Sequence, residues 1–299
     1  MSPPGGPSAG EVASRAFQPP DSTLERLVRQ ALEEDVGTGD VTTALTVSPG
    51  ALGTAAIVAK EELVLAGGAV AREVFLACDG SLAVDLLRPG GSLVAPGEEV
   101  LGLKGSLGAI LTGERTALNF LARLSGIATL TRRFVRAVEG TGARILDTRK
   151  TTPGWRLLEK EAVRLGGGHN HRMGLHDFIL VKDNHIAAAG GIAEAVRRVR
   201  EGNRGGLPLE VEVSSEEQLE EALALGVPRL LLDNMSLEEM ARAVRRAHEL
   251  GEGRPELEAS GNVTLETVRA VAGTGVDWIS VGALTHSARA ADLSLGVRG

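Results

Sequence analysis

The segment between Ile145 and Ile186 holds most of the side chains in this chain that could do chemistry. Only five of the 32 basic residues are Lys, so most cations are Arg. The segment contains three of the Lys, four of the six His and four Arg: Lys150, Lys160, Lys182, His169, His171, His176, His185, Arg149, Arg156, Arg164 and Arg172. On a chain of formal net charge −7, this cluster predicts a local site for anions and argues against a nucleic-acid surface.

The four His of this segment raise the question of a metal site. Zinc and iron ligands usually recur at i,i+4 on a helix or pair with Cys, and neither pattern occurs here. The sequence therefore favours His side chains that hydrogen-bond to an anionic or heteroaromatic ligand. The glycine run at 166–168, just before them, fits a phosphate-binding loop and an ordinary turn equally well.

Composition restricts the class of protein. At 299 residues, with 43% hydrophobic and 24% charged residues, the chain is long enough for one large or two ordinary globular domains. Its single cysteine, Cys78, excludes an intramolecular disulfide, suits a reducing cytoplasm and lies in an apolar run that predicts a buried, inert thiol. No apolar stretch is long enough to span a membrane and no signal-peptide pattern is present, so we expect a cytoplasmic protein without membrane partners.

The first half of the chain mixes helical and strand patterns. Residues 1–20, rich in Pro, Gly and Ser, predict a disordered tail, and a helix is expected from Ser22 to Glu34. Short apolar runs broken by Gly and Pro predict strands and turns over 51–113, with one helix near 69–77. A long helical pattern follows over 112–138, in which Gly126 predicts a break.

The second half has a regular strand-and-helix rhythm. Apolar strand-like runs recur at intervals of about 20 to 35 residues, the size of a βα unit. They are ARILD, FILVKD, LEVEV, RLLLDN, ELEASG and DWISVG. Most finish on a polar or charged residue: Asp147, Lys182, Glu212, Asp233 and Glu258. One such residue alone suggests a helix cap or a surface charge, but a series favours the active-site rim of a parallel βα barrel.

The last two strand exits carry glycine and predict a phosphate site. They are Glu258 to Asn262 and Ser280 to Ala283, where Gly261 and Gly282 would let an anion approach the backbone. Two ordinary tight turns are the alternative interpretation.

Two further features leave alternatives open. Glu212 and Asp233 either pair with the cationic segment or, beside a polyphosphate ligand, hold Mg²⁺. Arg115 follows a predicted helix start, where a cation opposes the helix dipole, so its guanidinium is expected to serve another purpose. A local salt bridge near Glu114 is the simpler explanation.

Together these motifs are specific. In order, GERTALNFLARLSGIAT, DTRKTTPG, EKEAVRLGGGHNHR, VKDNHI, EVEV, LLLDN, EASGN and ISVGALTHS resemble the quinolinate phosphoribosyltransferase family over nearly the whole chain after the tail. The resemblance implies an α/β fold with an N-terminal α/β sandwich at 21–125 and an incomplete, seven-stranded α/β barrel at 126–285. Residues 286–299 are expected to pack back on the N-terminal domain.

The resemblance also implies an activity and a set of roles. The activity is transfer of ribose 5-phosphate from phosphoribosyl pyrophosphate to quinolinate, with Mg²⁺, in NAD biosynthesis; the products are nicotinate mononucleotide, pyrophosphate and CO₂. The implied catalytic residues are Lys150, Lys182, Glu212 and Asp233, and Glu212 and Asp233 would also face the ribose and Mg²⁺. The implied dicarboxylate pocket comprises Arg149, Lys150, His171, Arg172 and Lys182, and Thr148 is a further implied substrate-binding residue. The implied 5-phosphate site comprises Ser260, Gly261, Asn262, Val281, Gly282 and Ala283. In a homodimer or a larger homo-oligomer, Arg115 would reach the site of the partner subunit.

Two other classes of function compete with this interpretation. A relative of the same fold that acts on nicotinate or in a molybdenum pathway should lack a cation for the second carboxylate, yet Arg149, Lys150, Arg172 and Lys182 are all present. A non-catalytic, phosphate-sensing barrel subunit would not need Glu212 and Asp233, and the chain has both.

Overall fold

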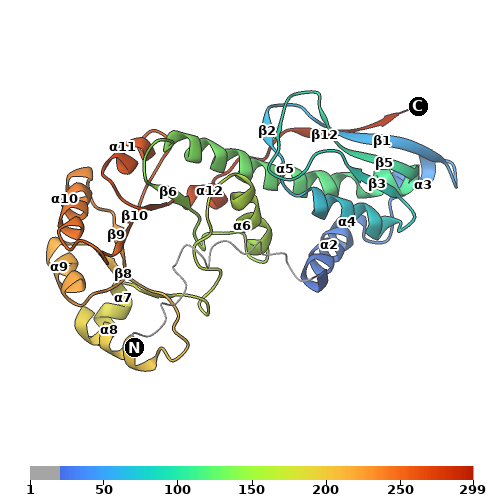
Figure 1. Cartoon of the computed structure of the whole chain (residues 1–299). Coiled ribbons are helices and arrows are strands. Elements are labelled where there is room, and N and C mark those ends of the chain that lie inside the picture. Colours follow the sequence, from blue (N-terminus) through green and yellow to red (C-terminus); the bar gives the residue numbers. More distant parts are fainter. Residues whose placement is uncertain (1–20, 299) are drawn as a thin grey trace, which may run out of the picture. The chain divides into compact units, whose positions relative to one another are not determined.

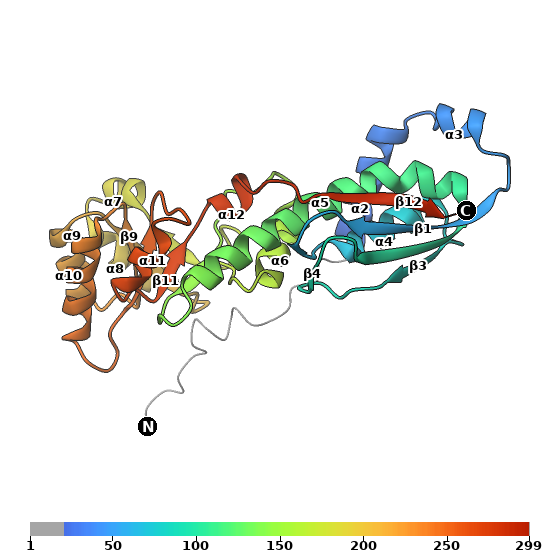
Figure 2. The same cartoon turned by 90° about the horizontal axis from the view of Figure 1, so that it is seen from above.

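The computed structural model describes residues 21–298, which form two compact units (Figures 1 and 2). The sandwich unit comprises 21–132, Thr151–Gly167 and 284–298, and the barrel unit comprises Arg133–Lys150 and Gly168–Ala283. The predicted tail at 1–20 lies outside the described residues. The expected domains were continuous stretches of chain, whereas the compact units interleave: Thr151–Gly167 belongs to the sandwich unit although barrel residues flank it on both sides.

An antiparallel sheet organises the sandwich unit. Its strand order is β12-β1-β5-β3, with β1 at Leu52–Ala59, β3 at Ala83–Leu86, β5 at Glu99–Ser106 and β12 at Leu293–Arg298. A separate pair joins β2 (Leu63–Val64) to β4 (Leu93–Val94). In the main sheet, Thr54 of β1 lies opposite Arg298 of β12. The end of the described chain is thus hydrogen-bonded to its first strand.

Helices complete the sandwich unit, with α2 packed on α4 and α4 packed on β3. They are α2 (Asp21–Val36), α3 (Val41–Thr46), α4 (Gly68–Cys78), α6 (Arg156–Leu165), most of α5 (Leu107–Ala137) and most of α12 (Ala283–His286). The strands predicted in the first half and the helix near 69–77 are confirmed, but α5 already begins at Leu107, inside the stretch 51–113 that was predicted to hold strands and turns. Cys78 is only half-buried, so the expectation of a buried thiol was too strong, but burial still raises the pKa of this thiol and disfavours the nucleophilic thiolate.

Helix α5 is continuous through Gly126, so the predicted break is wrong. Its apolar stripe is buried as expected: Ala117, Phe120, Leu121 and Leu124 are at most 2% exposed. A Cβ atom at Gly126 would lie 2.0 Å from the backbone oxygen of Arg289. The adjacent chain is held there by the Ala291 N–H, which donates to the Ala122 oxygen at 2.8 Å. Glycine therefore allows two backbones to touch and does not end the helix.

Replacing Gly126 with Ala should destabilise the sandwich unit. Relative to glycine, alanine stabilises a helix by about 1 kcal/mol. Overpacking against a backbone atom typically destabilises a protein by about 1–3 kcal/mol, and displacing the chain at 289–291 also removes a hydrogen bond. A net loss of about 2 kcal/mol in the free energy of unfolding is expected from denaturant titration. Gly108→Ala on the same helix is the control, because its Cβ would meet only Thr43 Cγ2 at 3.5 Å and Ser106 Oγ at 3.8 Å. Equal stability of the two variants would contradict the close-approach explanation.

The barrel unit is built on a parallel sheet in the order β6-β11-β10-β9-β8-β7. Its strands are β6 (Arg144–Leu146), β7 (Ile179–Val181), β8 (Leu209–Val213), β9 (Arg229–Asp233), β10 (Glu256–Ser260) and β11 (Trp278–Ser280). All six predicted strands are confirmed. A parallel bridge from Leu146 to His169 adds a one-residue seventh position beside β6, and among the described residues no pairing joins this position to β7. The sheet is therefore an incomplete barrel.

Helices lie on the outer side of this curved sheet (Figure 1). They are α7 (Asp183–Ala189), α8 (Ile192–Gly202), α9 (Glu216–Ala224), α10 (Leu237–His248) and α11 (Val268–Gly273). Local sequence explains their starts: Ser215 caps α9, and Ser236 forms a reciprocal capping box with Glu239 on α10. Within the described part of the chain, no helix has the length and apolar character needed to cross a membrane.

Candidate functional site

The predicted site residues of the barrel unit follow the carboxyl ends of parallel strands and therefore share one edge of the sheet. Thr148, Arg149 and Lys150 come after β6, Lys182 after β7, and Val281, Gly282 and Ala283 after β11. Glu212 lies one residue before the end of β8, while Asp233 and Ser260 are the last residues of β9 and β10. This carboxyl edge is the active-site face of barrel folds.

Cations from two chain segments meet at this edge. The Asp147 N–H donates to the His169 oxygen at 3.0 Å, and the His171 N–H donates to Asp147 Oδ1 at 2.9 Å. These bonds hold the segment of Arg149 beside that of Arg172. Burial and, to a smaller extent, the positive charge of nearby Arg149 lower the pKa of Arg172. An anion at this position would relieve that repulsion.

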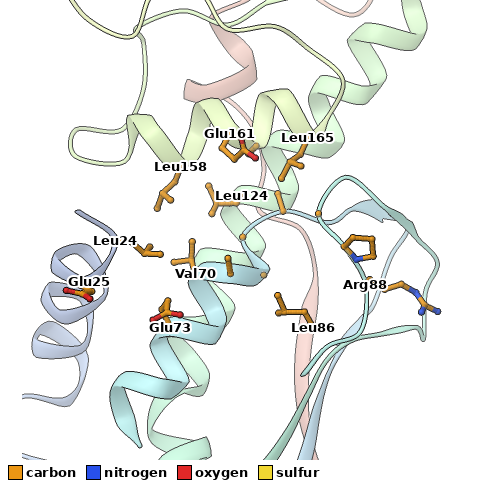
Figure 3. A pocket seen from close by; sticks show the side chains of 17 residues that line it. Leu24, Glu25, Val70, Glu73, Leu86, Arg88, Leu124, Leu158, Glu161 and Leu165 are labelled. Carbon is orange, nitrogen blue, oxygen red and sulfur yellow. The ribbon is translucent and has the colours of Figure 1, made fainter. Parts of the chain in front are cut away.

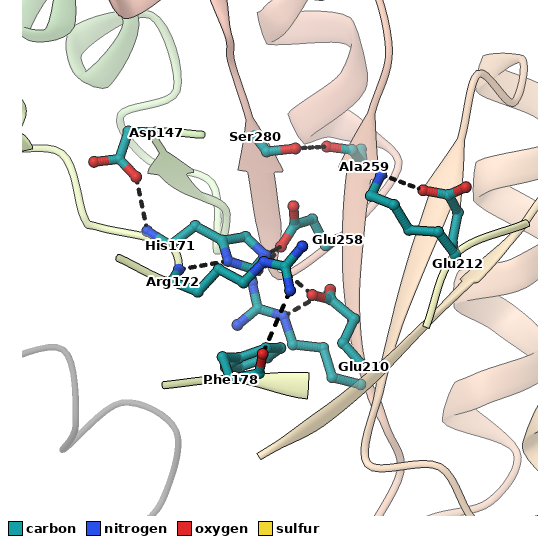
Figure 4. Close-up of polar contacts among 11 residues, drawn as sticks. Asp147, His171, Arg172, Phe178, Glu210, Glu212, Glu258, Ala259 and Ser280 are labelled. Atoms are coloured by element: carbon teal, nitrogen blue, oxygen red, sulfur yellow. Dashed lines mark hydrogen bonds and ion pairs between the residues drawn. The ribbon is translucent and has the colours of Figure 1, made fainter. Parts of the chain in front are cut away.

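Lys182 and Glu212 form an ion pair on neighbouring strands, with 2.7 Å between Nζ and Oε2 (Figure 4). The Glu212 side chain is 10% exposed and that of Lys182 is 45% exposed, so the cation faces the open edge and the carboxylate lies below it. The N–H of Asp183 adds a longer contact of 3.4 Å to Glu212 Oε1. Both carboxylate oxygens of Glu212 are thus engaged.

The ends of β9 and β10 have unusual backbone geometry. Asn234 and Asn262 have φ of 53° and 46°, and they are the non-glycine residues with positive φ among the described residues. Between them, Gly261 has φ of 111°, and a Cβ atom there would lie 2.2 Å from Asn234 Oδ1. Strained residues of this kind are typical of ligand-binding loops, and glycine is required at 261.

The last strand exit offers fewer backbone donors than the sequence implied. The N–H of Val281 donates to the Leu146 oxygen at 2.9 Å and extends the pairing of β11 with β6. In the structure as it stands, an anion at this exit would have to be met by the neighbouring residues of the 281–283 segment or by Ser260 to Asn262.

The four His of the cationic segment do not form one cluster. His169 packs edge-on against Trp278 with ring centroids 5.5 Å apart, and burial, followed by Arg144, lowers its pKa. Nδ1 of His185 accepts a hydrogen bond from the Lys182 N–H at 3.0 Å, at the start of α7. His176 is exposed. Of these four residues, only His171 contacts the carboxylates inside the barrel.

His171 belongs to a buried charged cluster that was not predicted from the sequence (Figure 4). Its Nε2 lies 3.0 Å from Glu210 Oε2 and 3.5 Å from Glu258 Oε2. Arg229 pairs with both carboxylates. Glu258 was expected at the rim, but it lies mid-strand and fully buried. The two Glu of LEVEV were the available signal, because a carboxylate within a strand buried on both faces needs a partner.

The contacts within this cluster shift the pKa values of its members. Burial lowers the pKa of His171, but Glu258 and Glu210 outweigh it and the net shift is upward. Burial and the adjacent Glu210 raise the pKa of Glu258. His171, Glu210 and Glu258 bring three possible metal ligands within 4.8 Å of one another, yet the guanidinium of Arg229 already supplies the positive charge there. The cluster is better described as an ion-pair network than as a metal site.

The glycine run at 166–168 serves packing and turning within the sandwich unit at its first two positions. A Cβ atom on Gly166 would lie 2.5 Å from the Ala128 oxygen of α5, and Gly167 has φ of 92°. Arg132 Nε donates to the Gly166 oxygen at 2.9 Å. These observations favour the turn interpretation over a phosphate loop.

Arg115 lies in the sandwich unit, exposed on α5. Because α5 begins at Leu107, Arg115 is beyond the first turn and the argument from the helix dipole does not apply to it.

A cavity of about 620 Å³ lies in the sandwich unit (Figure 3). Leu24, Val70, Leu124, Leu158 and Leu165 contribute to its mainly apolar lining. None of the predicted site residues lines it, so this hollow and the carboxyl edge are different places.

Comparison with known proteins decides the family. The model of the quinolinate phosphoribosyl transferase C-terminal domain matches residues 127–296, and that of the N-terminal domain matches 40–125. The chain belongs to the quinolinate phosphoribosyltransferase family. The match covers both units and every predicted site residue.

Relatives within the quinolinate phosphoribosyltransferase family support the assignment along the whole chain. A probable carboxylating nicotinate-nucleotide pyrophosphorylase of Bacillus subtilis is 44% identical over 274 residues, 92% of this chain and 93% of the relative. One from Synechocystis is 44% identical, with 93% and 94% covered. The solved nicotinate-nucleotide pyrophosphorylase of Francisella tularensis is 41% identical and superposes with a TM-score of 0.89 over 94% of this chain and 98% of that one. The mixed α/β fold predicted from the sequence is confirmed.

Proposed function

We propose that the carboxyl edge of the barrel unit is where this chain carries out the reaction of its family. That reaction transfers ribose 5-phosphate from phosphoribosyl pyrophosphate to quinolinate and releases pyrophosphate and CO₂, leaving nicotinate mononucleotide for NAD biosynthesis. The site assignment rests on one observation: cationic and carboxylate side chains share the carboxyl edge of the barrel sheet. Arg149, Lys150, Arg172 and Lys182 supply positive charge there, and Glu212 and Asp233 supply negative charge.

The cations match the charge of quinolinate. Planar guanidinium groups bind carboxylates through two parallel hydrogen bonds, and an ammonium adds a compact point charge. Arg149 and Arg172, brought close by the bonds around Asp147, suit one side of the dicarboxylate. Lys150 and Lys182 complete the set. When Lys182 meets a substrate carboxylate, its ion pair with Glu212 is weakened and Glu212 becomes available to the second substrate.

The carboxylates match the charge that develops during ribosyl transfer. The ring nitrogen of quinolinate forms a bond to the ribose C1 carbon while the bond to pyrophosphate breaks, and the ribose gains oxocarbenium character. Glu212 on β8, with Asp233 on the neighbouring strand β9, would stabilise that positive charge. The strained loop of Ser260, Gly261 and Asn262, with Gly282 and Ala283, would hold the 5-phosphate.

Glu212 and Asp233 also suit Mg²⁺, which favours one or two carboxylates together with substrate phosphate oxygens and water. Bound there with phosphoribosyl pyrophosphate, the ion would offset the charge of the departing pyrophosphate. Asp233 is half-buried at the end of β9, and its Oδ2 accepts a hydrogen bond from Asn234 Nδ2 at 2.9 Å. The donor set is therefore of the right chemical kind.

Decarboxylation needs no nucleophile from the protein. Once the ring nitrogen is ribosylated it is positive, so the electron pair left on C2 when CO₂ departs is stabilised by the ring itself. A proton from solvent then completes nicotinate mononucleotide. The contribution of Lys150, Lys182 and the Arg pair is to orient the dicarboxylate for this step.

We also propose a cytoplasmic homodimer or larger homo-oligomer in which Arg115 completes the site of the partner subunit. Support for the location comes from the single cysteine; some plant relatives are named as chloroplastic or mitochondrial, so location varies within the family. Support for a role in the partner's site is the exposure of Arg115 on α5, since an exposed guanidinium is free to meet an anion.

Subunit mixing tests this role. At quinolinate concentrations near the wild-type KM, Arg115→Ala and Lys182→Ala proteins should each have a much lower rate than the wild type. Heterodimers should regain activity, because one of their two sites receives both an intact Arg115 and an intact Lys182. Steady-state rates are measured after subunit exchange has been verified by native mass spectrometry. No recovery would place Arg115 in the site of its own chain or remove it from the reaction.

The function itself is tested by pyrophosphate release. Purified protein with Mg²⁺ and phosphoribosyl pyrophosphate should release pyrophosphate only when quinolinate is added, with one nicotinate mononucleotide formed for each pyrophosphate. Release that is independent of quinolinate, or no release at all, would contradict the proposed function.

A further inference from the structure

Four ionisable side chains occupy part of the barrel interior, where branched aliphatic residues are usual. They are His171, Glu210 on β8, Arg229 on β9 and Glu258 on β10. Glu210 and Glu258 expose no side-chain surface, and His171 and Arg229 expose 8% and 9%. Only His171 belongs to the predicted dicarboxylate pocket, so three of the four have no role in the reaction as described above.

Fold stability is a poor explanation for this cluster. Removing each ion from water costs several kcal/mol, and apolar residues of the same volume often give an equally stable or more stable core. Among the described protein groups, none forms a hydrogen bond of normal geometry with Oε1 of Glu258. Arg229 Nε lies 3.1 Å from Glu210 Oε1 without hydrogen-bond geometry. A network so incompletely satisfied is better explained by what it holds in place.

The cluster fixes the ring of His171. Nε2 donates to Glu210 Oε2 at 3.0 Å, and Nδ1 accepts from the Arg172 N–H at 2.6 Å. The ring also packs edge-on against Phe178, with centroids 5.2 Å apart. Arg229 lies over the same Phe178 ring, its guanidinium carbon 5.9 Å from the centroid. Hydrogen bonds and ring contacts therefore determine one orientation of the imidazole.

The orientation of His171 in turn determines where the Arg172 side chain begins. Two hydrogen bonds fix the backbone of these residues: the His171 N–H donates to buried Asp147, and the Arg172 N–H donates to the imidazole. The Arg172 side chain extends from this backbone toward Phe178, with 3.4 Å between Nη1 and the Phe178 oxygen (Figure 4). A shift of the imidazole would move the start of this side chain.

We propose that Glu210, Arg229 and Glu258 are positioning residues for quinolinate: they hold His171, and through it Arg172, in the arrangement that binds the dicarboxylate. This inference rests on the proposed function, in which His171 and Arg172 meet quinolinate. The three residues touch no substrate. Their effect is on quinolinate binding. Binding of phosphoribosyl pyrophosphate depends on residues at the strand ends and is little affected.

Glu258→Gln tests the inference, because it keeps the shape and removes the charge that pairs with Arg229. Arg229 then turns toward Glu210 and competes with His171 for its carboxylate. We expect KM for quinolinate to rise about 10-fold or more, as is usual when a supporting contact is lost. KM for phosphoribosyl pyrophosphate and kcat should change less than about twofold, since their determinants are elsewhere. Arg229→Lys, which keeps the charge but loses the planar fork, should show the same pattern and carries the test if the Gln variant does not fold.

The matched control is Asp277→Asn. Asp277 forms a part-buried ion pair with Arg254 at 2.6 Å, at the opposite, amino ends of β10 and β11. This variant should lower the thermal midpoint and leave KM for quinolinate unchanged. If Glu258→Gln behaves in the same way, with lower stability and an unchanged KM for quinolinate, the cluster is structural and the inference is overturned.

A double-mutant cycle identifies the route of the effect. If Glu258 acts through His171, Glu258→Gln should add less than about twofold to KM for quinolinate in a His171→Ala background. Additive effects would show that Glu258 acts independently and would overturn the inference. An inactive wild-type protein would instead contradict the proposed function, so the two failures are distinguishable.

Discussion

Replacing Glu212 with Gln, or Asp233 with Asn, is expected to lower kcat on the order of 10²-fold or more, the usual result of losing an electrostatic contribution to the transition state. Both carboxylates act on positive charge that exists only while the ribosyl group is in transit. Quinolinate binding should change little, because its negative charge is met by cations in the ground state. The amide that replaces the Glu212 carboxylate would still accept a hydrogen bond from Lys182, so the local geometry is retained.

The comparison that makes this result informative is Lys182→Ala, which should first raise KM for quinolinate. Glu220→Gln is the control for loss of a carboxylate, since Glu220 pairs with Arg246 between α9 and α10 and should not affect the rate. The measurement is steady-state kinetics at saturating Mg²⁺. Near-normal kcat for both amide variants would mean that Glu212 and Asp233 are structural partners of the cations.

Nicotinate is expected to be a poor substrate, with kcat/KM lower than that for quinolinate on the order of 10⁴-fold. Nicotinate lacks the second carboxylate, so it leaves part of the set formed by Arg149, Lys150, Arg172 and Lys182 without an anion. Like charges gathered at one edge repel each other, and a bound pyridine would exclude water from them, so a cation left without a carboxylate in that complex is strongly unfavourable.

The selectivity is measured by competing the two pyridines for limiting phosphoribosyl pyrophosphate. Both pyridines would give nicotinate mononucleotide, so only one of them carries a ring isotope label, and the labelled fraction of the nucleotide gives the ratio of the two kcat/KM values. Lys182→Ala should lower the ratio of kcat/KM for quinolinate to kcat/KM for nicotinate, because it removes a cation that favours the dicarboxylate. A wild-type enzyme with comparable kcat/KM for both pyridines would show that the cations serve the phosphates and not a second carboxylate.

Local pattern was sufficient for most of the barrel unit. Each of its six strands is a short apolar run bounded by turn residues, and parallel pairing places the ends of all of them at one edge. The positions of Lys182 and Asp233 at strand ends therefore agree with the prediction from chain position. In the sandwich unit, the helix break predicted at Gly126 is wrong, because this glycine accommodates the backbone of Arg289, which lies far along the chain.

The buried cluster could not be predicted from local sequence patterns either, because it too depends on contacts between residues far apart in the chain. That Glu210 and Glu258 point to a common interior depends on how the sheet curls and on the register of β8, β9 and β10, in which Glu210 lies opposite Arg229. Spacing along the chain placed Glu258 near a strand end, but the strand continues to Ser260. The interleaving of Thr151–Gly167 with the sandwich unit likewise depends on contacts between distant segments.

The central claim is that one site binds both carboxylates of quinolinate and removes one of them during ribosyl transfer. Following separately labelled carboxyl carbons tests it most directly. With quinolinate labelled in the C2 carboxyl group, the account predicts that all label leaves as CO₂, one for each nicotinate mononucleotide formed, and that C3-carboxyl label stays entirely in the nucleotide. Nucleotide that retains the C2 label, or CO₂ released without nucleotide, would contradict it.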